Sequence, residues 1–553
     1  MQIANAQAAH EGTYVLLVTN RFGSARTEPA IVRVQEGSDF LVTSLADDGV
    51  GTLRDAMRGA SSIAGGRITF SNVFGKIHLQ APLPEIKSDL SVIGPGPDQV
   101  QVSGADLFSV FKVVAGNVLI SGLTITEGFG ATGGGVVNSA NLTLSNCVIA
   151  ANSAIGPGGG GIANSGNLKV ISSLVLSNSA SGVDVPTYSM GSDVPTSAFG
   201  GGIHHSGSGL LISNSIIAGN AVRGGNGGGV EGVGYFQGAP SYGGGISIHG
   251  GTVHLVSSTI HANAAFGGLG GHGGTSSGGH GAEAAGGGLW ISDGWIDITN
   301  CTFSMNLAKG GNGGYGLIWG GLGGSANGGG IAQSSGGGVV INCTIANNQT
   351  EGGADGRNRN GWGGGFAFSS GGGLLGGSNF TFRNTIVAGN FPNDVAAQMN
   401  SGGHNLIGNS RNLTGLHSTD LTNVNARLGS LQPNGRFTPT HLPLPGSPAI
   451  DAGSQFGAPP WDQRGVRRPV GKGVDIGACE YEPITLTAKS AAGSLILLIQ
   501  GPIDYRYGIE RSANLLDWTL AATLDGGSGG LEWRESSAFD QSVRFYRAVV
   551  VGP

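Results

Sequence analysis

The side chains that could do chemistry gather in glycine-rich parts of this chain. The segment EGGADGRNRNGWGG places Asp355, Arg357 and Arg359 near Trp362, a composition suited to contacting a sugar or a carboxylate. Neighbouring glycine-rich segments carry aromatic residues whose rings could stack on a sugar, namely Tyr235, Tyr242, Tyr315 and Trp319. The alternatives are a solvated loop for the charged residues and the anchoring of loops for the aromatic ones.

Acidic residues are too dispersed to form a recognisable catalytic centre. A hydrolase of sugar chains needs carboxylates that face each other across the bond, and a calcium-dependent lyase needs clustered acids with a basic residue. Asp47 and Asp48 form a DD pair and His272 and His280 each lie between glycines, but none of them has the sequence context of such a site. We therefore predict no catalytic residue, and a polysaccharide lyase or glycoside hydrolase stays the alternative.

The sequence indicates no metal, cofactor or nucleic-acid site. Four cysteines are too few and too scattered for a disulfide framework or a CxxC zinc site. His204 and His205 follow a glycine triplet without the carboxylate or cysteine partners of a zinc site, and we expect them in a turn. Charged residues make up only 11% of the chain and the net charge is −6, which leaves no basic surface for nucleic acid.

The elements that must position these residues belong to a repeat. Seven segments similar to LISNSIIAGN align on a closing asparagine, at spacings of 26, 42, 43, 43, 42 and 42 residues. These asparagines are Asn152, Asn178, Asn220, Asn263, Asn306, Asn348 and Asn390. Each unit contains two or three short apolar strands of period two, bounded by Gly, Ser or Asn.

Strands this short cannot bury an apolar face alone, so the units must stack. Stacking in register satisfies the backbone hydrogen bonds and builds one apolar column of about ten coils, about 4.8 Å apart. The sequence thus predicts an all-β fold, a right-handed parallel β-helix. We predict that the seven asparagines form a structural ladder at one corner, because asparagine tolerates a left-handed backbone and its amide can bond to the same amide one coil away.

Most units also contain an insert of 21 or 22 residues that the 26-residue unit lacks. Inserts such as AAFGGLGGHGGTSSGGHGAEAA have too few branched apolar residues to fill a core. Glycine accounts for 108 of the 553 residues, and only glycine permits very close approach of backbones. We expect the inserts to leave one corner as loops and to stack as a second, glycine-packed layer; an extra coil per insert is the alternative.

Residues 38–482 resemble secreted bacterial β-helix proteins of the pectin-lyase-like class, with polymorphic-outer-membrane-protein-like repeats. VTSLADDGVGTLRDAM is similar to their N-terminal cap, and a helix is predicted over 52–59 with Leu53, Ala56 and Met57 on one face. LPLPGSPAIDAGSQFGAPPWDQRGVRRPVGKGVDIGACEYEP resembles the choice-of-anchor Q segment. Its alternating charges predict a salt-bridged cap over the C-terminal coil. The resemblance implies an exported protein and no known reaction.

Four regions are predicted: a partial immunoglobulin-like β-hairpin at 1–36, the capped β-helix at 38–440, the choice-of-anchor Q-like cap at 441–482 and a small β-sandwich at 483–553. The chain is expected to begin inside a longer protein. No apolar run approaches the roughly 18 residues of a membrane span, and no signal peptide is recognisable. The expected role is an extracellular or cell-surface, adhesin-like protein, with glycan binding by the inserts as the candidate activity.

Overall fold

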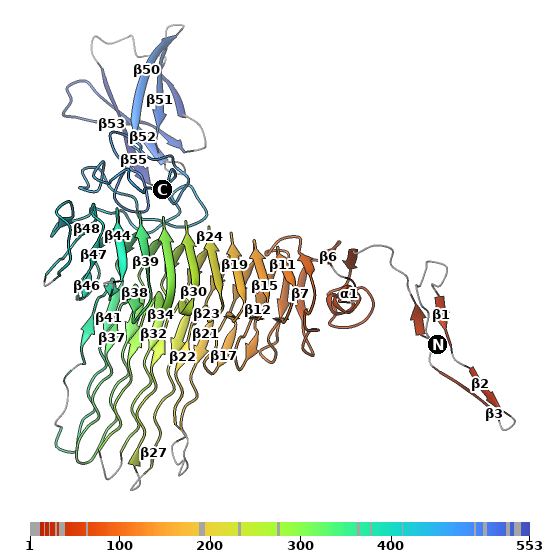
Figure 1. The fold of residues 1–553 in the computed structure, drawn as a ribbon. Coiled ribbons are helices and arrows are strands. Elements are labelled where there is room, and N and C mark those ends of the chain that lie inside the picture. The colour runs from red at the N-terminus through yellow and green to blue at the C-terminus, as the bar shows by residue number, and fades with distance from the viewer. Residues whose placement is uncertain are drawn as a thin grey trace.

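The computed structural model describes residues 12–15, 17–20, 23–27, 30–32, 39–61, 63, 65–186, 194–230, 234–273, 277–361, 365, 367–376, 379–396, 398–411, 413–491, 494–501, 506–526, 531–535 and 544–552. Its centre is a stack of coils whose strands run parallel to their neighbours along one axis (Figure 1). The all-β parallel β-helix predicted from the repeat is confirmed.

Two long parallel sheets form most of the coil walls. The first has 19 strands: β5 (Asp39–Val42), β6 (Gly66–Phe70), β8 (Leu90–Ile93), β10 (Phe111–Val113), β11 (Asn117–Ser121), β14 (Val136–Asn138), β15 (Asn141–Ser145), β18 (Ile162–Asn164), β19 (Asn167–Ile171), β23 (Ile203–His205), β24 (Gly209–Ser213), β30 (Ile246–Val256), β34 (Leu289–Thr299), β38 (Ile331–Gln333), β39 (Gly337–Ile341), β43 (Leu374–Leu375), β44 (Phe380–Arg383), β46 (Val395–Ala396) and β47 (Asn400–Ser401). The second has 12 strands, somewhat more than the ten coils expected: β7 (Gly75–His78), β9 (Val100–Ser103), β12 (Thr124–Thr126), β16 (Val148–Ala150), β20 (Leu174–Leu176), β25 (Ile216–Ala218), β31 (Thr259–His261), β35 (Thr302–Ser304), β40 (Thr344–Ala346), β45 (Ile386–Ala388), β48 (Leu406–Ile407) and β49 (Leu421–Thr422).

A third, seven-stranded sheet closes the coils: β13 (Phe129–Gly130), β17 (Ser153–Ile155), β21 (Ser179–Ser181), β26 (Ala221–Arg223), β32 (Ala264–Phe266), β36 (Leu307–Lys309) and β41 (Gln349–Glu351). The inserts leave the coils after its later strands and return through a five-stranded sheet: β22 (Ala198–Phe199), β29 (Ser241–Tyr242), β33 (Ala284–Ala285), β37 (Ala326–Asn327) and β42 (Ser369–Ser370). Alternate residues of the coil strands point inward, as in β30, where Val253 and Leu255 are fully buried.

The seven repeat asparagines form one buried column. Each amide Nδ2 donates to the Oδ1 of the next asparagine at 2.8–2.9 Å, and each backbone N–H donates to the same Oδ1. The left-handed backbone expected of these asparagines belongs instead to the residue before each, for example Ala262 with φ 53° and Met305 with φ 55°. That residue turns the chain so that the following amide points inward.

A second column runs along another corner and uses hydroxyl and thiol groups. The backbone N–H of Ser173 donates to Ser215 Oγ at 3.1 Å, and that of Cys301 donates to Cys343 Sγ at 3.4 Å. Cys147 belongs to the same column, so three cysteines that are dispersed in sequence occupy one repeated position. All four cysteines are buried and unpaired.

Both columns end on an aspartate. Asp394 Oδ1 accepts from the backbone and the amide of Asn390, the last ladder asparagine, at 2.8 Å. Asp420 Oδ1 accepts in the same way from Asn405, at 2.9 and 3.1 Å. The bonds that link successive positions of a column all donate toward the C-terminal end. The final position therefore has to accept from the position before it, and a carboxylate does so.

The inserts stack as a second layer beside the coils, as the glycine content predicted (Figure 1). Each has an outgoing arm (224–230, 267–273, 310–316 or 352–358) and a returning arm that leads back to the coil. Gly267 and Gly270 donate to the next outgoing arm at 2.9 Å, while Gly268 and Gly271 donate to the previous returning arm at 2.9 and 3.0 Å. This three-residue period matches polyproline II, which has three residues per turn and no internal hydrogen bonds.

Glycine is required where the arms touch. A Cβ on Gly271 would overlap the carbonyl oxygen of Gly228 in the preceding arm, and one on Gly314 would overlap that of Gly271. Every third residue of an outgoing arm instead points to solvent and can carry a side chain, as Leu269 and His272 do. The GGx pattern therefore follows from packing backbone directly against backbone.

A short helix and a C-terminal region flank the stack. The predicted helix is confirmed as α1 (Leu53–Ala60), capped by Thr52, whose hydroxyl accepts from the Asp55 N–H at 3.2 Å. Leu53, Ala56 and Met57 are buried, and the helix lies beside β5 and β6, the first strands of the stack (Figure 1).

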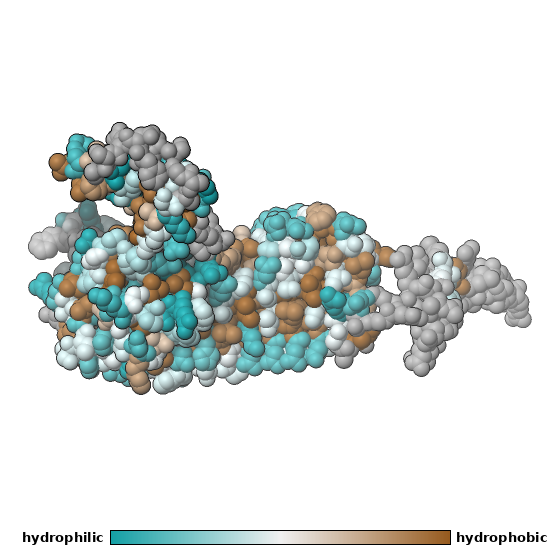
Figure 2. Space-filling view, turned by 90° about the horizontal axis from the view of Figure 1, so that it is seen from above, coloured by the Kyte–Doolittle hydropathy of each residue, from teal (hydrophilic) through white to brown (hydrophobic). Residues whose placement is uncertain are grey.

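The segment 436–482 lies along a flank of the stack and is not confined to its last coil. Thr259, Thr302 and Thr344, which are neighbours in the second sheet, bond to Pro439 O, Gln463 Oε1 and Ala478 N at 2.6, 2.7 and 3.0 Å. Beyond this segment, two three-stranded sheets project from the stack (Figure 1), and the space-filling view shows a lobe that stands off the stack (Figure 2). The sheets consist of β50 (Thr485–Ala491), β51 (Ser494–Gln500) and β54 (Leu531–Glu535) in one, and of β52 (Arg506–Ser512), β53 (Thr519–Asp525) and β55 (Phe545–Gly552) in the other.

Short antiparallel pairs occur near the N-terminus and in one insert. They join β1 (Gly12–Tyr14) to β4 (Ala30–Val32), β2 (Leu17–Asn20) to β3 (Gly23–Arg26), and β27 (Gly229–Val230) to β28 (Gly234–Tyr235). The four-region division of the chain, including the immunoglobulin-like hairpin, stays a prediction. No helix in the described ranges is long and apolar enough to cross a bilayer.

Candidate functional site

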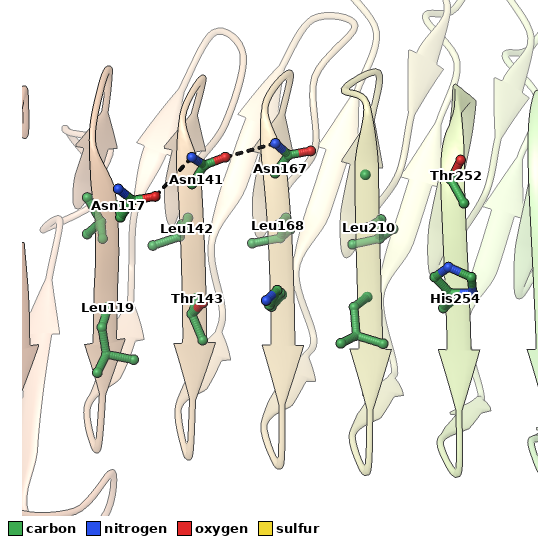
Figure 3. A pocket seen from close by; sticks show the side chains of 14 residues that line it. Asn117, Leu119, Asn141, Leu142, Thr143, Asn167, Leu168, Leu210, Thr252 and His254 are labelled. Carbon is green, nitrogen blue, oxygen red and sulfur yellow. Dashed lines mark hydrogen bonds between the residues drawn. The ribbon is translucent and has the colours of Figure 1, made fainter. Parts of the chain in front are cut away.

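The candidate site is a groove across the outer face of the first sheet (Figure 3). It crosses β11, β15, β19, β24 and β30 and encloses about 680 Å³. In each strand the residues that face the core, such as Leu142 and Leu168, are buried, and the alternate residues face the groove. The stacking of the coils therefore fixes the positions of the groove side chains.

One wall of the groove is a row of amides. Asn141 Nδ2 donates to Asn117 Oδ1 at 3.0 Å, and Asn167 Nδ2 donates to Asn141 Oδ1 at 2.8 Å (Figure 3). Each bond uses one of the two amide hydrogens and one of the two lone pairs. The row thus keeps hydrogen-bonding capacity that a ligand could use.

The second row combines apolar and basic residues. Leu119, Thr143, Lys169, Leu211 and His254 occupy equivalent positions on successive strands. This row and the amide row together offer apolar contact beside hydrogen-bonding groups. Such a combination suits a sugar, which has apolar ring faces and polar edges.

An aromatic and acidic pair on β34 lies beyond the last groove strand. Asp297 Oδ2 lies 3.3 Å from His254 Nδ1, and its Oδ1 accepts from Trp295 Nε1 at 2.9 Å. Trp295 is 55% exposed. Trp295 pairs with Thr252, so it lies one coil beyond the groove in the same outer row.

The groove has no carboxylate among its fourteen lining residues, of which Lys169 and His254 are the only ionisable ones. Cleavage by a pair of facing carboxylates is therefore not available from this lining. In the part of the chain that the structure describes, no group of three or more His, Cys, Asp or Glu side chains could hold a metal ion.

The structure does not bring the predicted insert residues together as a charged patch. Asp355 occupies the position of Gly313 in the preceding insert; its Oδ1 accepts from Gly323 N at 2.8 Å and its N–H donates to Gly365 O at 2.9 Å. It therefore ties the last insert to its neighbour. Arg357 and Arg359 are exposed, and no ion pair between described residues joins either of them to Asp355. Trp362 lies outside the described residues.

The predicted aromatic residues are dispersed over the insert layer. Tyr315 lies on an outgoing arm beside Arg357, whereas Trp319 lies on a returning arm, and they are 40% and 68% exposed. Tyr242 instead packs at the base of the inserts against Trp290, with ring centroids 4.4 Å apart. The Tyr235 backbone lies in β28, and its side chain is outside the described part of the chain.

Tyr242 belongs to a cluster that joins the inserts to the coils. Phe199, His204, His249 and Trp290 complete it, with ring centroids 4.7–5.9 Å apart. Burial lowers the pKa of His204 to about 3 and raises that of Tyr242 to about 12. His204 lies in β23, so the turn expected for it and for His205 is wrong; both continue strand rows of the first sheet.

The DD and Gly-His-Gly motifs have structural roles. Asp47 pairs with Arg54 at 2.6 Å and Asp48 with Arg58 at 2.7 Å, both at helix α1. His272 Nδ1 accepts from Tyr315 N at 3.0 Å, and His280 Nδ1 accepts from Leu322 N at 2.8 Å, so these histidines bond adjacent inserts. They do not converge on one site.

Charged residues of the flank segment form a buried ion-pair network. Arg464 bonds Asp462 at 2.8 Å, and Arg468 bonds Glu480. Burial raises the pKa of Asp475 to about 7, although two backbone N–H groups donate to it. These groups pair with one another in the interior of the flank segment, although Arg468 Nε is buried without a hydrogen-bond partner.

Comparison with known proteins adds no assignment. No protein-family model matches this chain, and no curated protein sequence matches it either. The parallel β-helix is thus established by the structure alone.

Sequence reasoning missed the groove residues. A spacing of 24 and 26 residues between Asn117, Asn141 and Asn167, each opening a strand as in NVLIS and NLTLS, was the available signal. That spacing is the coil repeat itself, and it places the three amides on one outer row.

Proposed function

We propose that this chain is an extracellular or cell-surface structural protein, adhesin-like, that binds a polysaccharide in the sheet groove without cleaving it. The observation that carries the proposal is a solvent-open groove lined by an amide row and by a row of apolar and basic residues, with no carboxylate among the lining residues. Five strands span about 19 Å across the groove. That length suits a chain of several sugar rings better than a single small molecule.

The principal alternative is a polysaccharide lyase. Lys169 and His254 are the groove side chains that could accept a proton from a sugar carbon. Lyase action would need a second group to neutralise the charge that develops on the sugar. Unsaturated products would therefore support the alternative, and binding without products supports the proposal.

The test combines binding and product analysis on the full chain. Neutral and acidic polysaccharides are immobilised, retention is measured, and reducing and unsaturated ends are assayed. Leu211→Ala should weaken retention about threefold, since it removes apolar contact from the groove floor. Val339→Ala is the matched control, because Val339 continues the same outer row beyond Asp297. Equal retention of both variants and wild type, or new chain ends, would contradict the proposal.

A further inference from the structure

A second concave surface lies on the outgoing face of the insert layer, apart from the sheet groove. It is a pocket of about 210 Å³ bounded by two rows of side chains. Register pairing places Arg223, Phe266 and Lys309 in one row. The other row holds Asn226, Leu269 and Asn312, one turn further along the same arms.

In each of the two rows, an apolar residue lies between two polar residues. Phe266 and Leu269 form an apolar centre, a cation flanks Phe266 on each side, and an amide flanks Leu269 on each side. Gly267, Gly310 and Gly311 also line the pocket, so backbone without side chains lies between the rows. A flat ring can therefore rest on the apolar centre with its substituents directed to both flanks.

The hydrogen-bond acceptors around this pocket are already engaged. Asn226 Oδ1 accepts from Leu269 N at 3.0 Å, and Asn312 Oδ1 accepts from Ala354 N at 2.9 Å. The main-chain carbonyls of Phe266, Leu269, Lys309 and Asn312 accept from the preceding arm at 2.8–3.0 Å. Each of these oxygens therefore keeps one lone pair at most, whereas Arg223 and Lys309 offer donors only.

Donors remain available. Arg223 uses Nη2 to bond Asp184, and Lys309 donates to Glu351 at 2.7 Å. A guanidinium carries five N–H groups and an ammonium three, so both cations keep donors for a ligand. Glu351 continues the cation row beyond Lys309, whereas Asp184 lies beside Asn226, from whose N–H and amide it also accepts at 2.7 and 3.2 Å.

From this excess of donors around an apolar centre, we propose that the pocket binds an anionic sugar unit, one that bears a sulfate ester or a carboxylate. The ring rests on Phe266 and Leu269, and the anionic group accepts from Arg223 and Lys309. The site is independent of the sheet groove, so either can fail without the other.

Dextran sulfate, polygalacturonate and unmodified dextran are the probes, with affinity measured by biosensor at low and at raised salt. Dextran sulfate or polygalacturonate should bind this face, more weakly as salt rises, and dextran should not. Arg223→Gln together with Lys309→Gln should weaken binding of the anionic probe about fivefold, and Phe266→Ala about threefold. Asp184→Asn should tighten it about twofold, because it removes the carboxylate that competes for Arg223.

Controls separate this site from general charge effects and from the groove. Arg506→Gln removes another exposed arginine that pairs with an aspartate, Asp525, and should leave binding unchanged. In a Leu211→Ala background, which alters only the sheet groove, the change of Arg223 and Lys309 should still weaken binding about fivefold, because the two sites are separate. Thermal unfolding checks that each variant is folded. Undiminished binding by the double variant, or no gain with Asp184→Asn, would overturn the inference.

Discussion

The coils and the inserts stack with the same period, but they bury different parts of the chain. The coils enclose side chains, as the fully buried Ile260 and the amide column ending at Asn390 show. The inserts bury backbone: Gly268 and Gly271 bond neighbouring arms where a Cβ would overlap a carbonyl oxygen. Coil stability therefore depends on specific side chains, whereas stability of the insert layer depends on their absence.

This difference also separates the two proposed sites. The side chains of the sheet groove are held in position by strands that pack on a buried core. The side chains of the insert pocket are held in position by stacked glycine arms, in which only every third residue can carry a side chain. Substitutions that test each kind of packing should therefore act on one region and spare the other.

The largest effect is expected in the ladder. Asn263→Leu keeps the branched shape of the side chain but leaves the backbone N–H and the amide of Asn220 without their acceptor. We expect a loss of about 4 kcal/mol in the free energy of unfolding, measured by denaturant titration. Asn312→Leu, at an exposed insert position, should cost less than about 1 kcal/mol. Equal losses would mean that buried amides do not dominate coil stability.

Acid should weaken the junction between the two regions. The folded pKa of His204 is about 3, below the 6.5 of the unfolded chain, because the ring is buried against His249. Below pH 6.5 the unfolded chain therefore binds the proton first, and stability falls as pH drops toward 3, by about 1.4 kcal/mol per unit. Denaturant midpoints at pH 7 and 4 measure this. His204→Phe should reduce the difference by about 3 kcal/mol; an unchanged difference would exclude His204 as its source.

A methyl group should loosen the insert layer locally. Gly271→Ala places a Cβ against the carbonyl oxygen of Gly228 and should cost about 2 kcal/mol. Hydrogen exchange should accelerate in the arms and stay slow at the coil asparagines. Leu269→Ala, which removes a solvent-facing side chain from the same arm, is the control. Faster exchange throughout the coils would show that the two regions are not separable.

The smallest effect is expected where the ladder ends. Asp394→Asn turns one oxygen into an N–H donor facing the Asn409 N–H, which now donates to Asp394 Oδ2 at 2.7 Å. We expect a loss of about 1–2 kcal/mol in unfolding free energy. Asp355→Asn keeps the single oxygen that Gly323 requires and should cost less than about 0.5 kcal/mol. A larger loss of unfolding free energy for Asp355→Asn than for Asp394→Asn would contradict this account of the two carboxylates.

The fold was predictable because a residue that contacts its counterpart in the next coil or insert must recur in the sequence at the period of the stack. Asn220 and Asn263 recur in sequence since each must meet the next amide, and the glycines recur because the arms leave no room for a Cβ. Outward side chains carry no such constraint, so the amide row of the groove continues as Gly209 and Thr252 after Asn167. Asp355 was assigned to a binding patch because it is charged, although its register with Gly313 places it at an insert contact.

The most direct test of the functional account is a crystal structure of the full chain with an oligosaccharide chosen from the retention assay. The account predicts an uncleaved sugar chain lying across β11, β15, β19, β24 and β30, with a ring against Leu211 and its hydroxyls on the amides of Asn141 and Asn167. A sugar chain bound only elsewhere on the coils, or one cleaved within the groove, would contradict it.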